Sequence, residues 1–255
     1  MTETRKPHVA IVARPKSDGR RWLACLAAAL LPGLIAAQAR ADEKPASSDE
    51  AQTSAAKNDG QKWTSLFDGK TLDGWKKTKF GGEGDVSVED GRIILGFGSD
   101  MTGIHTDRKL PKINYEVELE AMRVDGSDFF CGFTFPVKDD PCSLIVGGWG
   151  GGVIGLSSLD RLDASENETT TYREFKNGTW YKIRLRVSDH RIQAWIDGKE
   201  MIDVDTTNRK ISIRYEVEPS RPFGFATWQT TGALRGIRIR ELSDEEIKAA
   251  AVREE

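Results

Sequence analysis

The sequence predicts an all-β sandwich built from two antiparallel sheets. Residues 180–188 alternate strictly, with apolar side chains such as Ile183 and Leu185 on one face and charged side chains on the other, which is typical of a half-buried antiparallel strand. Asp-Gly and Asn-Gly pairs, which favour tight turns, separate many such short runs. No long segment keeps a helical period, so an all-β sandwich is the fold class that fits.

The N-terminal part of the chain lies outside this pattern. Residues 1–41 combine a basic start, an apolar stretch and an A-x-A cleavage pattern at 39–41, which together indicate an export signal. The adjacent Arg20 and Arg21 leave a twin-arginine signal and an ordinary secretory signal both open. The apolar stretch is shorter than the ~20 residues of a spanning helix. We therefore expect a mature chain without a membrane span, located in the periplasm or outside the cell.

Short segments of biased composition flank the predicted domain, which spans residues 62–242. Residues 42–61 are rich in Asp, Glu, Lys, Ser and Ala, which predicts a disordered linker. Ser243 and Glu246 have the spacing of a capping box, which predicts a short helix within the tail at 243–255. The formal net charge is −3, and an acidic exported domain is a poor candidate for binding nucleic acid.

The predicted strands are of two types. In the first type, at 113–122, 180–188 and 236–242, apolar residues alternate with charged ones. We expect ion pairs across one solvated sheet surface, between Glu116, Glu118 and Glu120 on one side and Arg184, Arg186, Arg238 and Arg240 on the other. Such cross-strand pairs each contribute roughly 0.2–1 kcal/mol. We interpret these charges as structural rather than catalytic.

The second type of strand is apolar on both faces and covers residues 128–135, 142–147 and 223–229. A strand of this kind needs either a covering layer or a ligand groove on its outer face. We expect both features together, with loops as the walls and this sheet as the floor of a binding cleft.

Four motifs carry a resemblance to a known family. They are L-F-D-G-K-T-L-D-G-W at 66–75, the strand and turns at 180–198, F-G-F-A-T-W-Q at 223–229 and R-G-I-R-I-R-E-L at 235–242. Together they resemble the 3-keto-disaccharide hydrolase domain family, over roughly residues 63–242. The resemblance implies a concanavalin-like jelly-roll sandwich and a small 3-keto-glycoside as substrate. It is specific for the family and weak for the reaction.

Sugar recognition requires an aromatic platform beside planar polar groups. Trp149 stands in V-G-G-W-G-G-G-V, where it fits either a sugar-stacking rim or a lid on the core. Trp228 and Gln229 lie on opposite faces of a predicted strand, so one of them should face the cleft, with a core tryptophan as the alternative. Asp128, at the start of an apolar strand, is a further binding candidate.

A long polar loop at 157–175 supplies candidate acid and base groups. Its cluster for proton transfer and hydroxyl recognition consists of Glu166, Asn167, Glu168 and Arg173. The alternative is a solvated loop without a role in the site. His105 is the one histidine suited to act as a general base near neutral pH, although a lone strand histidine is more often structural.

The implied mechanism begins at a ketone on C3 of the sugar, which acidifies the hydrogen on C2. A base removes that proton, the oxygen on C1 leaves, and water adds to complete hydrolysis. We assign the base to His105 or Glu168, the stabilisation of the enolate to Arg173 and the acid to Glu166. The E-x-D-x-x-E motif of lectin-fold glucanases is absent from the sequence, which disfavours a direct two-carboxylate glycosidase. A non-catalytic carbohydrate-binding or adhesion module is the competing class.

Metal binding and disulfide formation receive weaker support. The sequence has no His cluster, H-E-x-x-H or C-x-x-C pattern and so does not support a transition-metal site. The weak candidates for oxygen ligands to Ca²⁺ are Asp139, Asp140, Asp160 and Asp163. Cys131 and Cys142 flank a predicted turn, and export permits a disulfide between them. Two separate buried thiols are the alternative.

Overall fold

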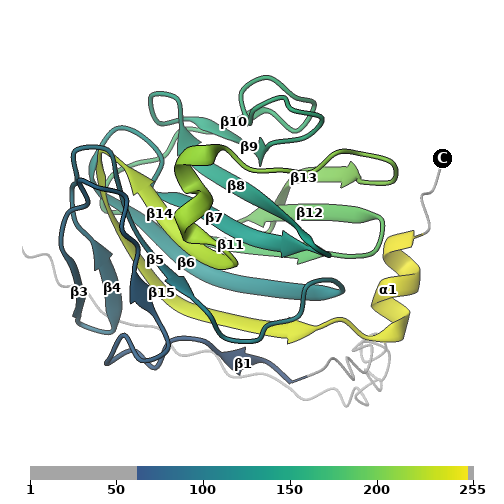
Figure 1. The fold of residues 1–255 in the computed structure, drawn as a ribbon, viewed down its shortest axis with the longest axis horizontal. Coiled ribbons are helices and arrows are strands. Elements are labelled where there is room, and N and C mark those ends of the chain that lie inside the picture. Colours follow the sequence, from purple (N-terminus) through teal and green to yellow (C-terminus); the bar gives the residue numbers. More distant parts are fainter. Residues whose placement is uncertain (1–61, 252–255) are drawn as a thin grey trace, which may run out of the picture. The chain divides into compact units, whose positions relative to one another are not determined.

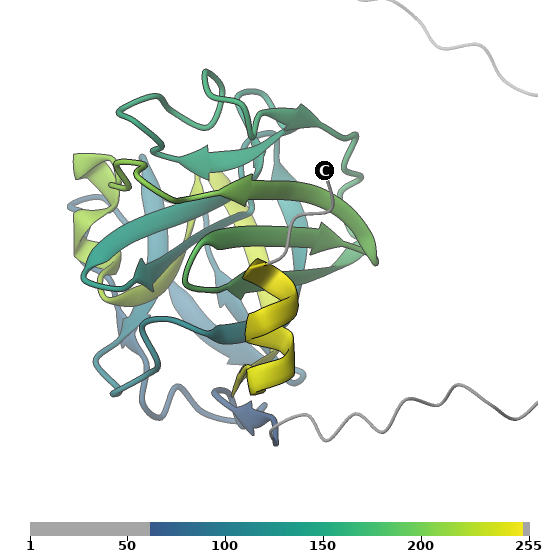
Figure 2. The same ribbon diagram turned by 90° about the vertical axis from the view of Figure 1, so that its right-hand side faces the viewer.

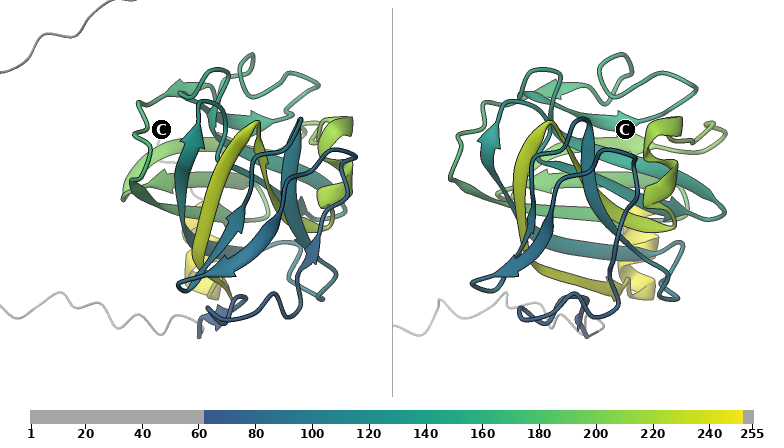
Figure 3. Two further views of the ribbon diagram at one scale, coloured as in Figure 1. Left: turned by 90° about the vertical axis from the view of Figure 1, so that its left-hand side faces the viewer. Right: turned by 60° about the vertical axis from the view of Figure 1, so that its left-hand side comes forward.

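The computed structural model describes residues 62–251, and this part is an all-β sandwich of two antiparallel sheets, as predicted (Figure 1). Side views show the strands in two layers (Figures 2 and 3). The predicted export signal at 1–41 and the predicted linker at 42–61 lie outside the described residues.

The described residues form an eight-stranded and a seven-stranded sheet. Sheet A has the order β13-β12-β11-β6-β15-β4-β3, with β1 paired to β15. Its strands are β1 (Thr64–Ser65), β3 (Val86–Glu89), β4 (Arg92–Leu95), β6 (Tyr115–Gly126), β11 (Trp180–Val187), β12 (Arg191–Ile196), β13 (Lys199–Asp205) and β15 (Thr230–Glu241). Sheet B has the order β10-β9-β8-β7-β14-β5-β2. Its strands are β2 (Lys76–Lys77), β5 (Met101–Thr106), β7 (Cys131–Val137), β8 (Asp140–Gly148), β9 (Val153–Ser157), β10 (Thr171–Tyr172) and β14 (Phe223–Trp228).

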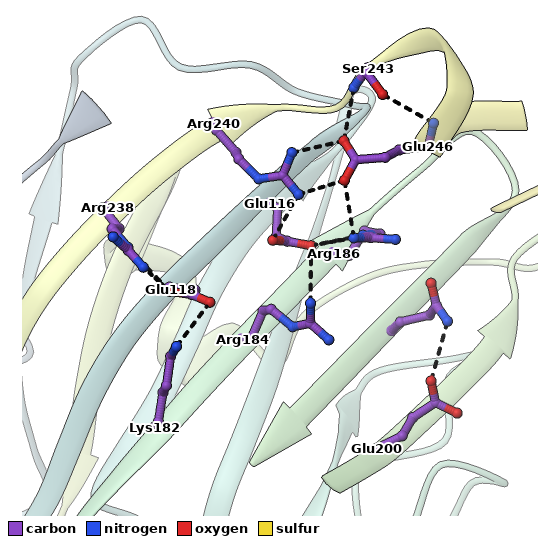
Figure 4. Close-up of polar contacts among 11 residues, drawn as sticks. Glu116, Glu118, Lys182, Arg184, Arg186, Glu200, Arg238, Arg240, Ser243 and Glu246 are labelled. Atoms are coloured by element: carbon purple, nitrogen blue, oxygen red, sulfur yellow. Dashed lines mark hydrogen bonds and ion pairs between the residues drawn. The ribbon is translucent and has the colours of Figure 1, made fainter. Parts of the chain in front are cut away.

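Sheet A contains the strands that alternate between apolar and charged residues. Its central strand β6 lies between β11 and β15, which places acidic side chains between two basic rows. Glu116 pairs with Arg186 at 2.7 Å and with Arg240 at 3.1 Å, and Glu118 pairs with Arg238 at 2.5 Å (Figure 4). The predicted ion pairs therefore form, and they cover the solvent side of this sheet.

Aromatic side chains pack against one another in the core between the two sheets. Phe133 on β7 and Phe225 on β14 are register partners, and their rings stack with centroids 4.5 Å apart. Phe223 packs edge-on against Phe133 at 4.8 Å, and Trp75 lies 5.7 Å from Phe225. The Trp75 indole nitrogen donates to the Leu66 carbonyl at 2.8 Å, so the two ends of the 66–75 motif are joined. This motif is therefore a folding element that seals one side of the core.

Glycines occur on the outer face of sheet B where other segments pack directly on it. A side chain at Gly155 on β9 would lie 2.3 Å from the carbonyl oxygen of Ala164. A side chain at Gly224 on β14 would lie 2.5 Å from the carbonyl oxygen of Ser220, in the 3₁₀ helix η1 (Tyr215–Ser220). The loop after β9 and the turn η1 thus each pack directly on part of sheet B.

The cysteines do not form the disulfide that export would permit. Cys131 and Cys142 lie on the adjacent strands β7 and β8, but Cys131 is opposite Val146 and Cys142 is opposite Phe135. A register offset of four residues separates them by roughly 13 Å along the strands, which is too far for a disulfide. Both are free and fully buried, and burial raises the pKa of each thiol to about 12. The alternative of two buried thiols is correct.

The predicted capping box starts the helix α1 (Asp244–Ala251), at the end of β15 (Figures 1 and 2). The Glu246 amide donates to the Ser243 hydroxyl at 3.2 Å, and the Ser243 amide donates to the Glu246 carboxylate at 3.0 Å. Glu246 also pairs with Arg240 at 2.7 Å and with Arg186 at 3.5 Å, which fastens α1 to the charged surface of sheet A (Figure 4). Within residues 62–251, no helix has the length and apolarity that a membrane span requires.

Candidate functional site

A cavity of about 280 Å³ lies on the outer face of sheet B. Its floor consists of Ser143 and Ile145 on β8 and Ser157 on β9. These residues alternate with Leu144 and Leu156, which are fully buried in the core, so the floor side chains point away from it. The cavity walls come from other segments and contain Met101, Asp128, Phe129, Trp149, Arg214, Glu216, Val217 and Trp228.

One end of the cavity is a cluster of charged groups around Arg214. The Arg214 guanidinium donates to Glu216 at 2.7 and 3.2 Å and to Asp163 at 2.5 Å. The second oxygen of Asp163 accepts from the Ser157 hydroxyl at 2.6 Å. Tyr215, between Arg214 and Glu216 in the sequence, is 83% exposed, whereas both of its neighbours line the cavity. We call Asp163, Arg214 and Glu216 the charged triad.

The charged triad keeps both carboxylates ionised. The hydrogen bond from Arg214 holds the pKa of Glu216 below its ordinary value. Burial raises the pKa of Asp163, but the hydrogen bonds from Ser157 and Arg214 outweigh that effect and leave the pKa lowered. These carboxylates can accept protons or hydrogen bonds, whereas the guanidinium provides a fixed positive charge at the same end of the cavity.

The other end of the cavity is aromatic. Trp149 occupies the turn between β8 and β9 in a left-handed conformation, with φ of 48°, and its side chain is 47% exposed. The Asp128 carboxylate accepts the amide of Gly150 at 3.1 Å and the amide of Phe129 at 2.7 Å. This pairing ties the tryptophan turn to the segment before β7. The cavity therefore offers a large aromatic face beside a carboxylate, the combination that suits a sugar ring.

Three predicted binding residues lie at this cavity and two do not. Trp149, Trp228 and Asp128 line it. Of the pair on opposite strand faces, Trp228 is thus the one that faces the cavity. Gln229 turns away, with its side-chain amide donating to the Ser99 carbonyl at 2.9 Å.

Asn167 does not face the cavity either, because its side chain is used within its own loop. It is buried, and its amide group donates to the carbonyls of Leu156 at 2.7 Å and Asp163 at 2.8 Å. Its oxygen accepts the amide of Thr169 at 2.9 Å. Asn167 therefore holds the loop against β9 rather than a ligand.

The structure does not bring the predicted acid and base groups of the 157–175 loop together. Glu166 is exposed and accepts the Asp163 amide at 3.3 Å. Glu168 forms a two-point ion pair with Arg209 at 2.6 and 3.1 Å, which lowers the pKa of that carboxyl group. Arg173 pairs with Asp197 at 2.5 Å. None of these three side chains is among the residues that line the cavity.

His105 also lies apart from the cavity. Its Nδ1 atom is 2.9 Å from the Thr78 hydroxyl. On β5 it is four residues from Met101, the cavity residue of that strand, and four residues of strand span roughly 13 Å. The histidine therefore has a hydrogen-bond partner of its own and is not among the residues that line the cavity.

Arg214, Glu216, Ser143 and Ser157 were not predicted as site residues. Arg214 and Glu216 lie in a segment that has neither strand alternation nor a turn dipeptide, so no local pattern singled them out. Their R-Y-E spacing, with charges two residues apart around an aromatic side chain, is the available signal. Asp163 was considered only as a calcium ligand.

The candidate calcium ligands are dispersed. Asp139 pairs with Lys112 at 3.0 Å, Asp160 with Arg209 at 2.6 Å and Asp163 with Arg214. In the described part of the chain, no three His, Cys, Asp or Glu side chains are grouped to hold a metal ion.

The fold defines an architectural class, the jelly-roll sandwiches of two antiparallel sheets. The family model of the 3-keto-alpha-glucoside-1,2-lyase-like domain matches residues 62–240. The chain therefore belongs to this family, as the four motifs predicted. Comparison with curated protein sequences gave no match.

Several solved structures are similar in fold. Crh5 transglycosylase in complex with NAG has a TM-score of 0.50 and 14% identity, over 72% of this chain and 88% of that chain. The carbohydrate-binding module CBM66 from Bacillus subtilis has a TM-score of 0.43 and 12% identity, over 66% of this chain and 96% of that chain. A third similar structure is domain 4 of AbnA, an extracellular arabinanase from Geobacillus stearothermophilus, in complex with arabinotriose. Its TM-score is 0.44 and its identity 17%, over 70% of this chain and 87% of that chain. At such identities the likeness concerns the fold alone.

Proposed function

We propose that this chain is an exported carbohydrate-active enzyme that cleaves small 3-keto-glycosides in the cavity of sheet B. The observation that carries the proposal is the pairing of an aromatic wall, formed by Trp149 and Trp228, with the charged triad at the opposite end. A cavity of about 280 Å³ lies near the lower limit of ~300 Å³ for small-ligand pockets. A ligand of one or two sugar rings therefore fits better than a polysaccharide chain.

The reaction needs a base for the hydrogen on C2 and a positive charge near the oxygen on C3. Glu216 has the properties of the base, because it is ionised and reaches the cavity. Arg214 has the properties of the enolate stabiliser, because its charge does not titrate. The C2–H bond breaks, a C1–C2 double bond forms, and the C1–O bond breaks as the leaving oxygen takes a proton from water. Addition of water across that double bond completes hydrolysis.

These roles replace the first assignments to His105, Glu166, Glu168 and Arg173. A base has to come within hydrogen-bond reach of the proton it removes. The ion pairs of Glu168 and Arg173 hold both side chains outside the cavity. Glu216 and Arg214, in contrast, both line the cavity.

The second candidate function is a carbohydrate-binding module. It is favoured by the pairing within the charged triad, because a guanidinium group bonded to two carboxylates can also serve only to hold a wall in place. A binding module requires Trp149 and Trp228 and tolerates loss of the Glu216 charge, whereas an enzyme of the proposed type does not.

The test is incubation of the purified protein with a 3-keto-disaccharide and with its non-oxidised parent, with and without chelator, while released monosaccharide is followed. We expect release from the keto sugar alone and a large loss of rate in Glu216→Gln. Glu168→Gln is the matched control, since it makes the same change in an ion-paired carboxylate outside the cavity. Saturable binding without turnover, lost in Trp149→Ala, would establish the binding module instead.

A further inference from the structure

Arg123 is a buried cation that the proposed chemistry does not use. It lies near the end of β6 in sheet A, and only 5% of its surface is exposed. None of the ion pairs within residues 62–251 includes Arg123, although the charge of Asp128 acts on its guanidinium group from beyond ion-pair distance. Burying an unpaired charge is costly unless hydrogen bonds replace its water, so the partners of Arg123 indicate its purpose.

Those partners come from three separate segments of the chain. The Nε atom donates to the Asn177 side chain at 2.8 Å, and Nη2 donates to the Phe175 carbonyl at 2.6 Å. The Nη1 atom donates to the carbonyls of Asp128 at 3.3 Å and Gly151 at 3.4 Å. Two short bonds therefore fix the guanidinium group, and its remaining donors reach the two segments that form the aromatic end of the cavity.

The aromatic end depends on this arrangement. The segment of Asp128 and the turn of Trp149 are already joined by the bond from the Gly150 amide to the Asp128 carboxylate. A side chain at Gly151, whose φ is 108°, would lie 2.7 Å from Nη1 of Arg123, so the turn lies directly against the guanidinium group. Asn177 and Phe175 lie in the loop that links β10 to β11, and Phe175 is buried in the core, so this loop is a fixed support.

We infer that Arg123 is a positioning residue, which holds Trp149 and Asp128 at the distance from each other that ligand binding requires. The inference rests on the proposed function only for the identity of the ligand. The planar guanidinium group of Arg123 donates to three segments at once, and the single ammonium group of a lysine lacks that geometry.

The test compares Arg123→Lys with Arg191→Lys, a matched control on sheet A whose partner is Asp203. With the 3-keto-disaccharide as substrate, we expect Arg123→Lys to raise KM roughly tenfold and to change kcat little, because the charged triad is untouched. In a Trp149→Ala background the same substitution should raise KM by a smaller factor than in wild type, because part of its effect acts through Trp149. Additive effects on KM, or a loss confined to kcat, would overturn the inference.

A second readout does not depend on turnover. Hydrogen exchange at the amides of Gly150 and Gly151 should be faster in Arg123→Lys, while the amides of β11 keep their protection. Unchanged exchange in the turn, or an equal rise throughout the chain, would overturn the inference. A wild-type protein that turns over no keto sugar would refute the proposed function alone, since this exchange measurement would still decide the role of Arg123.

Discussion

Removal of Arg214 is the perturbation that separates its proposed catalytic role from a purely structural one. Arg214 makes three hydrogen bonds to the carboxylates of Asp163 and Glu216. Its side chain is 50% exposed, but that of Asp163 is only 11% exposed, so solvent screens the pairs in part and their loss should cost roughly 1–2 kcal/mol of stability. For a domain of this size, each kcal/mol corresponds to a fall in Tm of about 2–4 °C.

The expected loss of activity is far larger than the loss of stability. Loss of one stabilising donor from a developing oxyanion typically lowers kcat by about 10²–10³-fold. We therefore expect Arg214→Met to lower kcat on the 3-keto-disaccharide by at least about a hundredfold. Arg214→Lys keeps the charge without the planar guanidinium group, so its kcat should lie between those of wild type and Arg214→Met.

The pH dependence adds an independent check. Arg214 lowers the pKa of Glu216, so its removal should raise that pKa toward the ordinary value of 4.5. A base is active when ionised, and the acidic limb of the pH–rate profile should therefore move to higher pH in Arg214→Met. A variant that keeps kcat within threefold of wild type, with an unchanged acidic limb, would refute the assigned role.

Three further predictions concern binding and stability. Trp149→Ala should weaken sugar binding by about 2 kcal/mol, or roughly thirtyfold, as measured by calorimetry; unchanged affinity would exclude Trp149 from the site. Reducing agent should leave Tm unchanged, and thiol reagents should not label native Cys131 or Cys142 at pH 8, because both are buried with a pKa of about 12; rapid labelling would contradict the described core. The hydrogen bond from Arg240 lowers the pKa of Glu246 to about 2, so its stabilisation is full above pH 4.5 and is lost as the pH falls through about 2. In urea unfolding, Glu246→Gln should lose less stability than wild type as the pH falls from 4.5 to about 2. An identical dependence of the unfolding free energy on pH in the two proteins would contradict the assignment.

The sequence was most informative about the sheets. Alternation places one side of each strand on the core, and it identified β6, β11 and β15 as one charged layer whose ion pairs then formed. The doubly apolar strands β7, β8 and β14 were likewise grouped correctly, because such strands need cover on both faces. The spacing of Ser243 and Glu246 fixed the start of α1.

The site was less predictable because it depends on long-range approach. Arg214 meets Asp163 from 51 residues further along the chain, and no local period encodes that contact. Glu168 and Arg173 have the right chemistry but are held by Arg209 and Asp197, partners that are distant in sequence. Trp149 was identifiable because the surrounding glycines mark a turn, and a turn at a sheet end presents its side chain locally.

The central claim is that the cavity promotes removal of the hydrogen on C2 next to a ketone. The most direct measurement compares the rate of leaving-group release from a 3-keto-glycoside carrying hydrogen or deuterium at C2, with the non-oxidised parent glycoside beside them. The account predicts slower release from the deuterated keto sugar and no release from the parent. Release from the parent at a comparable rate, with no effect of deuterium, would contradict it.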